Sequence, residues 1–196
     1  MRLRWANNEE IHIENLFNFE CTGLESGFHY FWKGLKNKVM ASHRMNNSSS
    51  RSHCILTFTV QQIDLKTPEN IIMSKLQLVD LAGSERQSTV AGGNLTIQKE
   101  SIEINKSLFT LRQVISALTD NNSVRDAHSA LSQLNYTYVP YRESKLTSIL
   151  RQSLGGNSYT LMLACITPAD EYYEENVSTL NYASRASNIS NVPTIN

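Results

Sequence analysis

Apolar residues recur along this chain with two periods, which predict strands and helices in alternation. Residues 54–62 read CILTFTVQQ, so Leu56 and Phe58 face one side while the intervening threonines face the other. Such a two-residue period is typical of a strand with unequal faces. Residues 74–80, SKLQLVD, predict a second strand that ends at Asp80. Two short strands are expected on either side of the polar turn at residues 6–10.

Helical spacing of apolar residues predicts the longer elements. We expect a helix over residues 23–40 and another over residues 99–120. The apolar stripe of the second helix is formed by Ile104, Leu108, Leu111, Ile115 and Leu118. Its opposite, polar face is expected to carry Glu103, Lys106, Thr110 and Gln113.

The C-terminal part predicts a helix, a strand and a final helix. Residues 142–156, RESKLTSILRQSLGG, form a helical pattern closed by two glycines. The unbroken apolar run at residues 159–167 is typical of a strand covered on both faces. A last helix is expected over residues 171–187. Strands separated by long helices favour an α/β layer structure, but so few strands predict an incomplete domain.

Composition excludes several classes of protein. The chain has 196 residues, 40% hydrophobic and 18% charged, as in globular proteins. Its formal net charge is zero, so no overall basic field attracts nucleic acid or anionic lipid. No apolar run is long enough for membrane insertion. The three cysteines have no metal or disulfide spacing, so a soluble protein with reduced thiols is expected.

The stretch DLAGSE, residues 80–85, offers the first candidate for phosphate chemistry. Ligands of open α/β sheets gather beyond the carboxyl ends of the strands, where Asp80 is expected. Its carboxylate can hold Mg²⁺ through water, and Gly83 allows the backbone to approach a phosphate. The alternative is that Asp80 caps a turn and Gly83 bends it.

The stretch NNSSSRSH, residues 46–53, offers the second candidate for phosphate chemistry. Ser49 and Ser50 can ligate magnesium or contact a terminal phosphate, and Asn46 can donate to a phosphate oxygen. Arg51 can pair with Glu85, which would join the two loops and hold a water molecule in line for attack. The alternative is a solvated loop or a phosphorylation site.

In this order, five stretches resemble the kinesin motor domain: NNSSSRSH, LVDLAGSER, INKSL, VPYRESKLT and SLGGNSYTLMLACITP. The resemblance implies the kinesin-type P-loop NTPase fold, a central mixed sheet with helices on both faces, present here as its C-terminal portion. It implies that residues 46–53 are switch I and that residues 80–85 are switch II, with ATP and Mg²⁺ as cofactors. It further implies an ATPase that moves on microtubules, in the cytoplasm and on the cytoskeleton.

The same resemblance implies where the filament binds and how the chain is divided. Lys106, Arg142 and Lys145 are the candidate contacts to tubulin, the alternative being ordinary solvated cations. Residues 1–189 are expected to be motor domain, and residues 190–196 the start of the neck linker.

One departure from the family pattern bears on activity. Kinesin motor domains carry a phosphate-binding loop of the form GxxxxGK[ST], and residues 1–196 contain none. Three interpretations stay open. The chain is part of a motor ATPase, a microtubule-binding pseudo-motor that does not hydrolyse ATP, or a fragment of a longer protein. Oligomeric state is expected to depend on a stalk outside this sequence.

Overall fold

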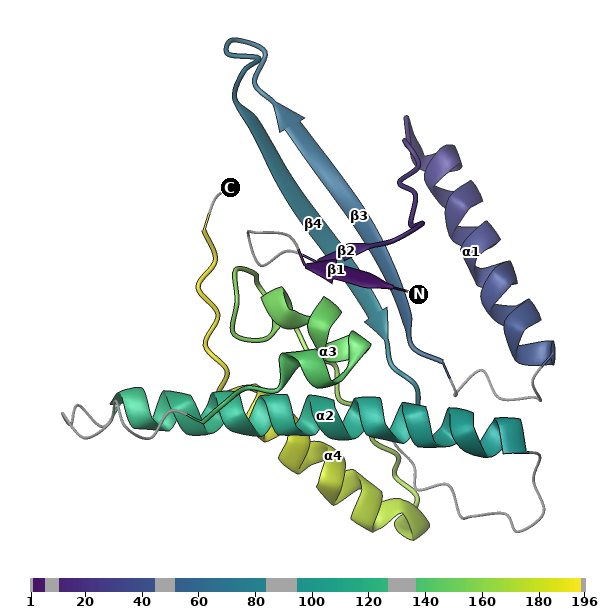
Figure 1. Cartoon of the computed structure of the whole chain (residues 1–196), viewed down its shortest axis with the longest axis vertical. Helices are drawn as coiled ribbons and strands as arrows, with labels where there is room; N and C mark the ends of the chain where they lie inside the picture. The colour runs from purple at the N-terminus through teal and green to yellow at the C-terminus, as the bar shows by residue number, and fades with distance from the viewer. Residues whose placement is uncertain (1, 6–10, 45–51, 84–94, 127–136, 195–196) are drawn as a thin grey trace. The chain divides into compact units, whose positions relative to one another are not determined.

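The computed structural model describes residues 2–5, 11–44, 52–83, 95–126 and 137–194 (Figure 1). The chain divides into two compact units, Met1–Ile104 with Asn196, and Asn105–Ile195. Each unit is considered by itself below.

The first unit contains two antiparallel hairpins and one long helix. Strands β1 (Leu3–Trp5) and β2 (Ile11–Ile13) pair with each other, as expected from the sequence. Helix α1 runs from Leu24 to Arg44, four residues beyond its predicted end. Along the chain, the candidate phosphate loop at residues 46–53 follows α1.

The long hairpin of the first unit joins β3 (Cys54–Ile63) to β4 (Ile71–Asp80). All ten residue pairs are in register, from Ile63 opposite Ile71 to Cys54 opposite Asp80. The turn between the strands is held by Asp64, whose carboxylate accepts from the Lys66 N–H at 2.9 Å and the Thr67 hydroxyl at 2.8 Å. Because the register is continuous, the two strands reach the Cys54–Asp80 end together.

The second unit contains most of helix α2, which runs from Leu95 to Asp126. Short helices follow: η3 (Tyr141–Glu143), α3 (Lys145–Ile149) and η4 (Arg151–Ser153). The expected single helix over residues 142–156 is therefore broken into three short pieces. After η5 (Asp170–Tyr172), the unit ends with α4 (Tyr173–Ala186), close to its predicted bounds.

The buried side chains of the second unit come mainly from α2 and α3. The apolar ones are Leu111, Val114, Ile115, Ala117, Leu146 and Leu150. Helix α4 lies against α2: the Arg185 guanidinium donates to the Ser116 hydroxyl at 2.9 Å, and Arg112 lies over the Tyr182 ring. Burial raises the pKa of the Tyr182 phenol, and the positive charge of Arg112 partly opposes this shift.

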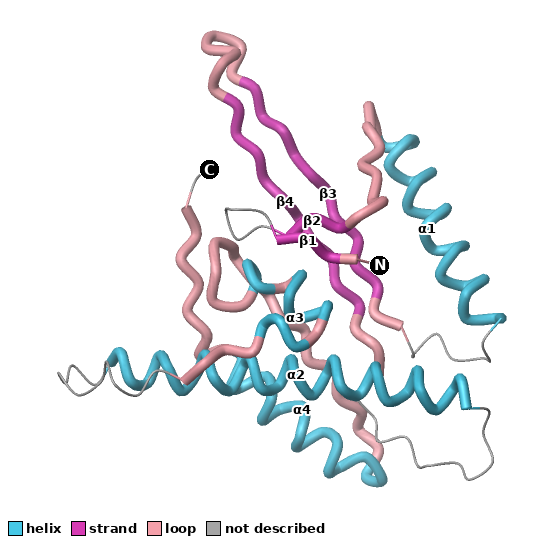
Figure 2. The backbone as a smooth tube through the Cα atoms, in the orientation of Figure 1, coloured by secondary structure: helices cyan, strands magenta, loops and turns pink. Residues whose placement is uncertain are grey.

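Two further expectations about the second unit are wrong. Thr110 was expected on the polar face of α2, but it is 2% exposed. Its hydroxyl donates to the Lys106 carbonyl at 2.9 Å, which satisfies the polar group and lets the methyl group be buried. The apolar run at residues 159–167 forms no strand within the described part of the chain (Figure 2). A strand needs a neighbour for its backbone groups, and none of the described strands pairs with this run.

Candidate functional site

The end of the β3–β4 hairpin brings the two candidate phosphate loops to one place. The last pair of the ladder is Cys54 opposite Asp80. Switch I, as the resemblance assigns it, ends at His53, directly before this pair. Switch II, assigned by the same resemblance, begins at Asp80. An antiparallel hairpin that closes in register therefore places both loop attachments at the same edge.

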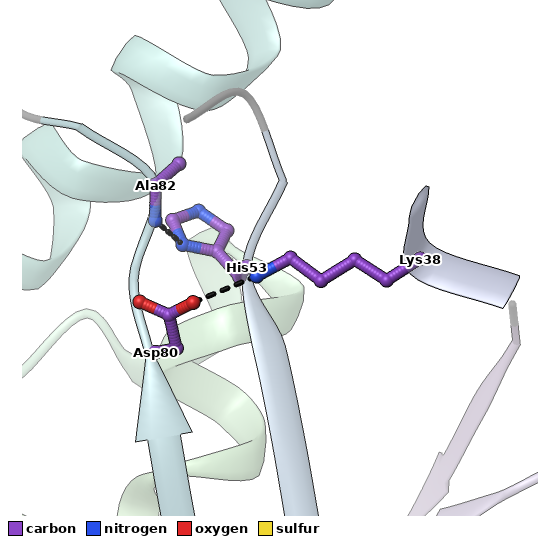
Figure 3. A network of polar contacts seen from close by, with 4 residues as sticks. All are labelled: Lys38, His53, Asp80 and Ala82. Carbon is purple, nitrogen blue, oxygen red and sulfur yellow. Dashed lines mark hydrogen bonds and ion pairs between the residues drawn. The ribbon is translucent and has the colours of Figure 1, made fainter. Parts of the chain in front are cut away.

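Asp80 accepts a charged hydrogen bond from helix α1 (Figure 3). Lys38 Nζ lies 2.7 Å from Asp80 Oδ2. The Lys38 side chain is only 18% exposed, whereas that of Asp80 is 73% exposed. Since the carboxylate is open to solvent, it can still accept from water molecules around a metal ion. The residue therefore fits the role of holding Mg²⁺ through water.

His53 connects the same two segments by a second bond. The Ala82 N–H donates to His53 Nδ1 at 3.0 Å, across the end of the hairpin (Figure 3). Burial lowers the pKa of the His53 imidazole below its usual 6.5, and the nearby Asp80 carboxylate partly opposes this shift. A neutral ring suits the bond, since Nδ1 can accept only when it carries no proton.

Most of the predicted catalytic residues lie outside the described residues. These are Asn46, Ser49, Ser50, Arg51 and Glu85. Gly83 is described and directly follows the buried Ala82. The pairing of Arg51 with Glu85 stays a prediction, as do the phosphate and metal contacts of the three polar residues of switch I.

The three predicted filament residues are all described and all exposed. Lys106 lies on α2, Arg142 in η3 and Lys145 at the first position of α3. All three belong to the second compact unit. Their exposure makes them accessible to a partner, but their contact with tubulin stays a prediction.

A network of hydroxyl groups fixes the backbone that carries Arg142 and Lys145. Ser144 caps α3 by accepting from the Thr147 N–H at 3.0 Å. The hydroxyls of Thr147 and Ser148 both donate to the Tyr141 carbonyl, at 2.8 and 2.9 Å. Thr147 is fully buried, so these bonds are shielded from water. The sequence pattern did not predict this network, because a serine before a helix signals only the cap itself.

The segment between α2 and η3 is tied at its base by Asn121. Its side-chain amide donates to the Thr137 carbonyl at 2.9 Å and its oxygen accepts from the Thr137 N–H at 2.8 Å. Asn121 is 8% exposed, so both bonds lie in the interior. The pair therefore ties Thr137, where the described chain resumes after α2, to this helix.

No described helix is long and apolar enough to cross a membrane. No group of three or more His, Cys, Asp and Glu side chains in the described ranges could hold a metal ion.

Comparison with known proteins assigns the family. Residues 1–189 match the kinesin motor domain. The mouse (Mus musculus) kinesin-like protein KIF16B is 50% identical over 198 residues, covering 100% of this chain and 15% of that protein. The Arabidopsis thaliana kinesin-like protein KIN-4A is 46% identical over 177 residues, covering 84% of this chain and 16% of that protein. The chain therefore belongs to the kinesin motor-domain family.

Solved structures agree with this assignment. The structure of a fast kinesin, described with implications for ATPase mechanism and interactions with microtubules, matches with a TM-score of 0.82 at 35% identity. A KIF14 dimer with AMP-PNP in complex with a microtubule matches with a TM-score of 0.81 at 38% identity. Each match covers 100% of this chain, and 51% and 52% of the solved chains respectively. The predicted family and fold class are thus confirmed, and the chain spans about half the length of these solved chains.

Proposed function

We propose that this chain is the switch-bearing and filament-binding part of an ATP-driven microtubule motor. The observation that carries the proposal is the Cys54–Asp80 closure of the β3–β4 hairpin, since it brings the two loop attachments to one edge. Kinship with a solved KIF14 that binds AMP-PNP and a microtubule supports the same partners here. The proposed fuel is Mg-ATP, and the proposed location is the cytoplasmic microtubule cytoskeleton.

In this proposal the chain's residues act by position and charge. Asp80 would hold Mg²⁺ through water, and Ser50 would ligate the metal directly. Asn46 and Ser49 would donate to the terminal phosphate. The ion, when bound, neutralises charge that develops on the phosphate oxygens, which is its general role in phosphoryl transfer.

Closure of the two loops would complete the site. Arg51 and Glu85 would join switch I to switch II, and the Gly83 N–H would lie near the terminal phosphate. Such a bridge would hold the attacking water in line, so it would act on the hydrolysis step rather than on nucleotide binding.

We further propose that residues 190–196 begin a neck linker. Asn191 accepts from the Gly155 N–H at 2.7 Å and donates to the Ser153 carbonyl at 3.2 Å. Three residues on, the Thr194 N–H donates to the Asn157 side-chain oxygen at 2.6 Å. These bonds hold the tail along residues 153–160, which supports an element that can be docked or released.

A second candidate is a microtubule-binding module that does not hydrolyse ATP. The exposed cations Lys106, Arg142 and Lys145 would serve either candidate, because filament binding by charge needs no nucleotide. Nucleotide binding and turnover by the chain as given separate the two candidates. Tight ATP binding with turnover stimulated by microtubules would exclude the second one.

The switch bridge gives the sharper test of the motor proposal. In a motor domain that carries these residues together with a phosphate-binding loop, Arg51→Ala or Glu85→Ala should lower microtubule-stimulated turnover by about 100-fold or more. Nucleotide affinity should change little, because neither residue holds the base or the first two phosphates. Turnover close to that of the unchanged motor in either variant would overturn the proposed role of the two switches.

A further inference from the structure

His53 occupies the point where the two switch segments leave the hairpin. It directly precedes Cys54, the first residue of β3, and Ala82 lies two residues past Asp80, the last residue of β4. The ladder of backbone bonds has ended at this point. The bond from the Ala82 N–H to His53 Nδ1, 3.0 Å long, continues the link between the two segments by a side chain instead.

Burial makes this link hard to replace. Ala82 is 4% exposed, so a water molecule cannot replace the imidazole as the acceptor of its N–H. The imidazole is half-buried and favours the neutral form with Nδ1 as acceptor. The Lys38–Asp80 ion pair anchors the last residue of β4 to α1, so this end of the hairpin is fixed both at Asp80 and at Ala82 (Figure 3).

We propose that His53 is a positioning residue for ATP hydrolysis, which rests on the function proposed above. By accepting the Ala82 N–H, His53 sets where Gly83 follows relative to residue 53, the last residue of the proposed switch I. The two segments must meet for a bridge between them to form. His53 therefore acts through the loops and touches neither nucleotide nor metal in this scheme.

The chemistry of the ring suggests a matched pair of variants. Asparagine places its side-chain oxygen where Nδ1 lies in histidine, so His53→Asn keeps an acceptor for the Ala82 N–H. Glutamine places its oxygen nearer the position of Nε2, so His53→Gln keeps polarity and moves the acceptor away. Both variants are polar and of similar size, which separates the bond from general folding effects.

The experiment uses a motor domain that contains these residues and a phosphate-binding loop. In the first arm, hydrogen exchange of the Ala82 amide is measured. His53→Gln should accelerate it about tenfold or more, and His53→Asn should keep it within about threefold of the unchanged motor. Equal exchange in both variants would overturn the proposed positioning, whatever the motor's activity.

In the second arm, microtubule-stimulated turnover is measured beside ATP affinity. His53→Gln should lower kcat about tenfold with ATP affinity within about twofold, and His53→Asn should restore most of kcat. Gln61→Ala, an exposed change farther along β3, serves as the control. Faster Ala82 exchange with kcat equal to this control would reduce His53 to a structural role and overturn the proposal.

Failure of the motor proposal is distinguishable in the same experiment. If the unchanged motor shows no stimulated turnover, the proposed function is wrong, while the exchange arm still decides whether His53 positions the switch II segment.

Discussion

At the scale of single residues, the pKa of His53 can be measured directly. Burial lowers this pKa below 6.5, and the Asp80 carboxylate opposes the shift. We therefore expect Asp80→Asn to lower the His53 pKa further, because the favourable charge is lost. An NMR titration of the imidazole measures it, with Asp64→Asn at the far turn of the hairpin as control. A His53 pKa that rises in Asp80→Asn would contradict this assignment.

The lowered pKa of His53 determines how the contribution of this residue to stability changes with pH. The folded protein resists protonating His53, whereas the unfolded chain accepts a proton near pH 6.5. The contribution of His53 to the free energy of unfolding is thus complete above pH 6.5 and falls as pH drops from there towards the lower folded-state pKa. His53→Asn should flatten this part of the stability–pH profile.

Gly155 is a residue whose replacement should be costly. It has a positive φ of 79°, and an added Cβ would lie 2.8 Å from Leu118 Cδ2 and 3.2 Å from the Tyr141 hydroxyl. We expect Gly155→Ala to lower the free energy of unfolding by about 1–3 kcal/mol. Gly34 lies within α1, and a Cβ added there would meet no atom within 4 Å. Gly34→Ala should therefore raise the free energy of unfolding by up to about 1 kcal/mol. Denaturant unfolding of both variants tests the contrast, and equal effects would contradict it.

At the scale of elements, amphipathic helices could be predicted and contacts between distant segments could not. The apolar residues at helical spacing, among them Leu111 and Ile115, predicted helix α2, and both side chains are buried in the structure. The exposed run at residues 159–167 shows the opposite case. Apolar composition predicts that a segment will be covered, but the partner that would make it a strand is set by distant sequence.

In the candidate site, too, the strand end could be predicted from the local sequence and the contacts between distant residues could not. Asp80 was expected at a strand end, and β4 does end there. The approach of Lys38 to Asp80 had no local signal, because 42 positions separate the two residues along the chain. The bond from Ala82 to His53 likewise depends on the register of the hairpin, which alternation alone does not fix.

The C-terminal tail, which begins at residue 190, allows a prediction at the scale of elements. Asn191→Ala removes the bonds to Gly155 and Ser153 and should release the tail from residues 153–160. We expect amide hydrogen exchange at Val192 to rise about tenfold, because its bond to the Gly156 carbonyl would lose its neighbours. Ser190→Ala, at an exposed position beside it, is the control. Unchanged protection of Val192 in Asn191→Ala would show that the tail is held by other contacts.

At the scale of the whole chain, a net charge of zero means that the proposed filament binding must rest on a local group of charges. Exposed charge pairs are worth about 0–1 kcal/mol each and are screened by salt. Single alanine changes at Lys106, Arg142 or Lys145 should therefore weaken microtubule binding modestly, and the triple change strongly. Co-sedimentation of a motor domain carrying these residues, at low and moderate salt, measures the loss.

A matched triple variant separates position from total charge. Lys33, Lys36 and Lys66 are exposed in the other compact unit, so alanine at all three removes the same charge elsewhere. Normal pelleting is expected from this control. If the two triple variants pellet alike, the proposed filament face is wrong, and the residues between Asn121 and Tyr138 become the next candidate.

The uncovered run after Asn157 also bears on how this protein is made in a cell. Tyr159 is 94% exposed, Leu161 85% and Leu163 80%. The hexapeptide from Thr160 to Cys165 has no charge, proline or glycine, a composition that stacks readily into amyloid-like sheets. An exposed segment of this composition is one that we expect to promote aggregation unless another segment covers it. We therefore expect polar substitutions in the hexapeptide to raise the soluble yield of the chain.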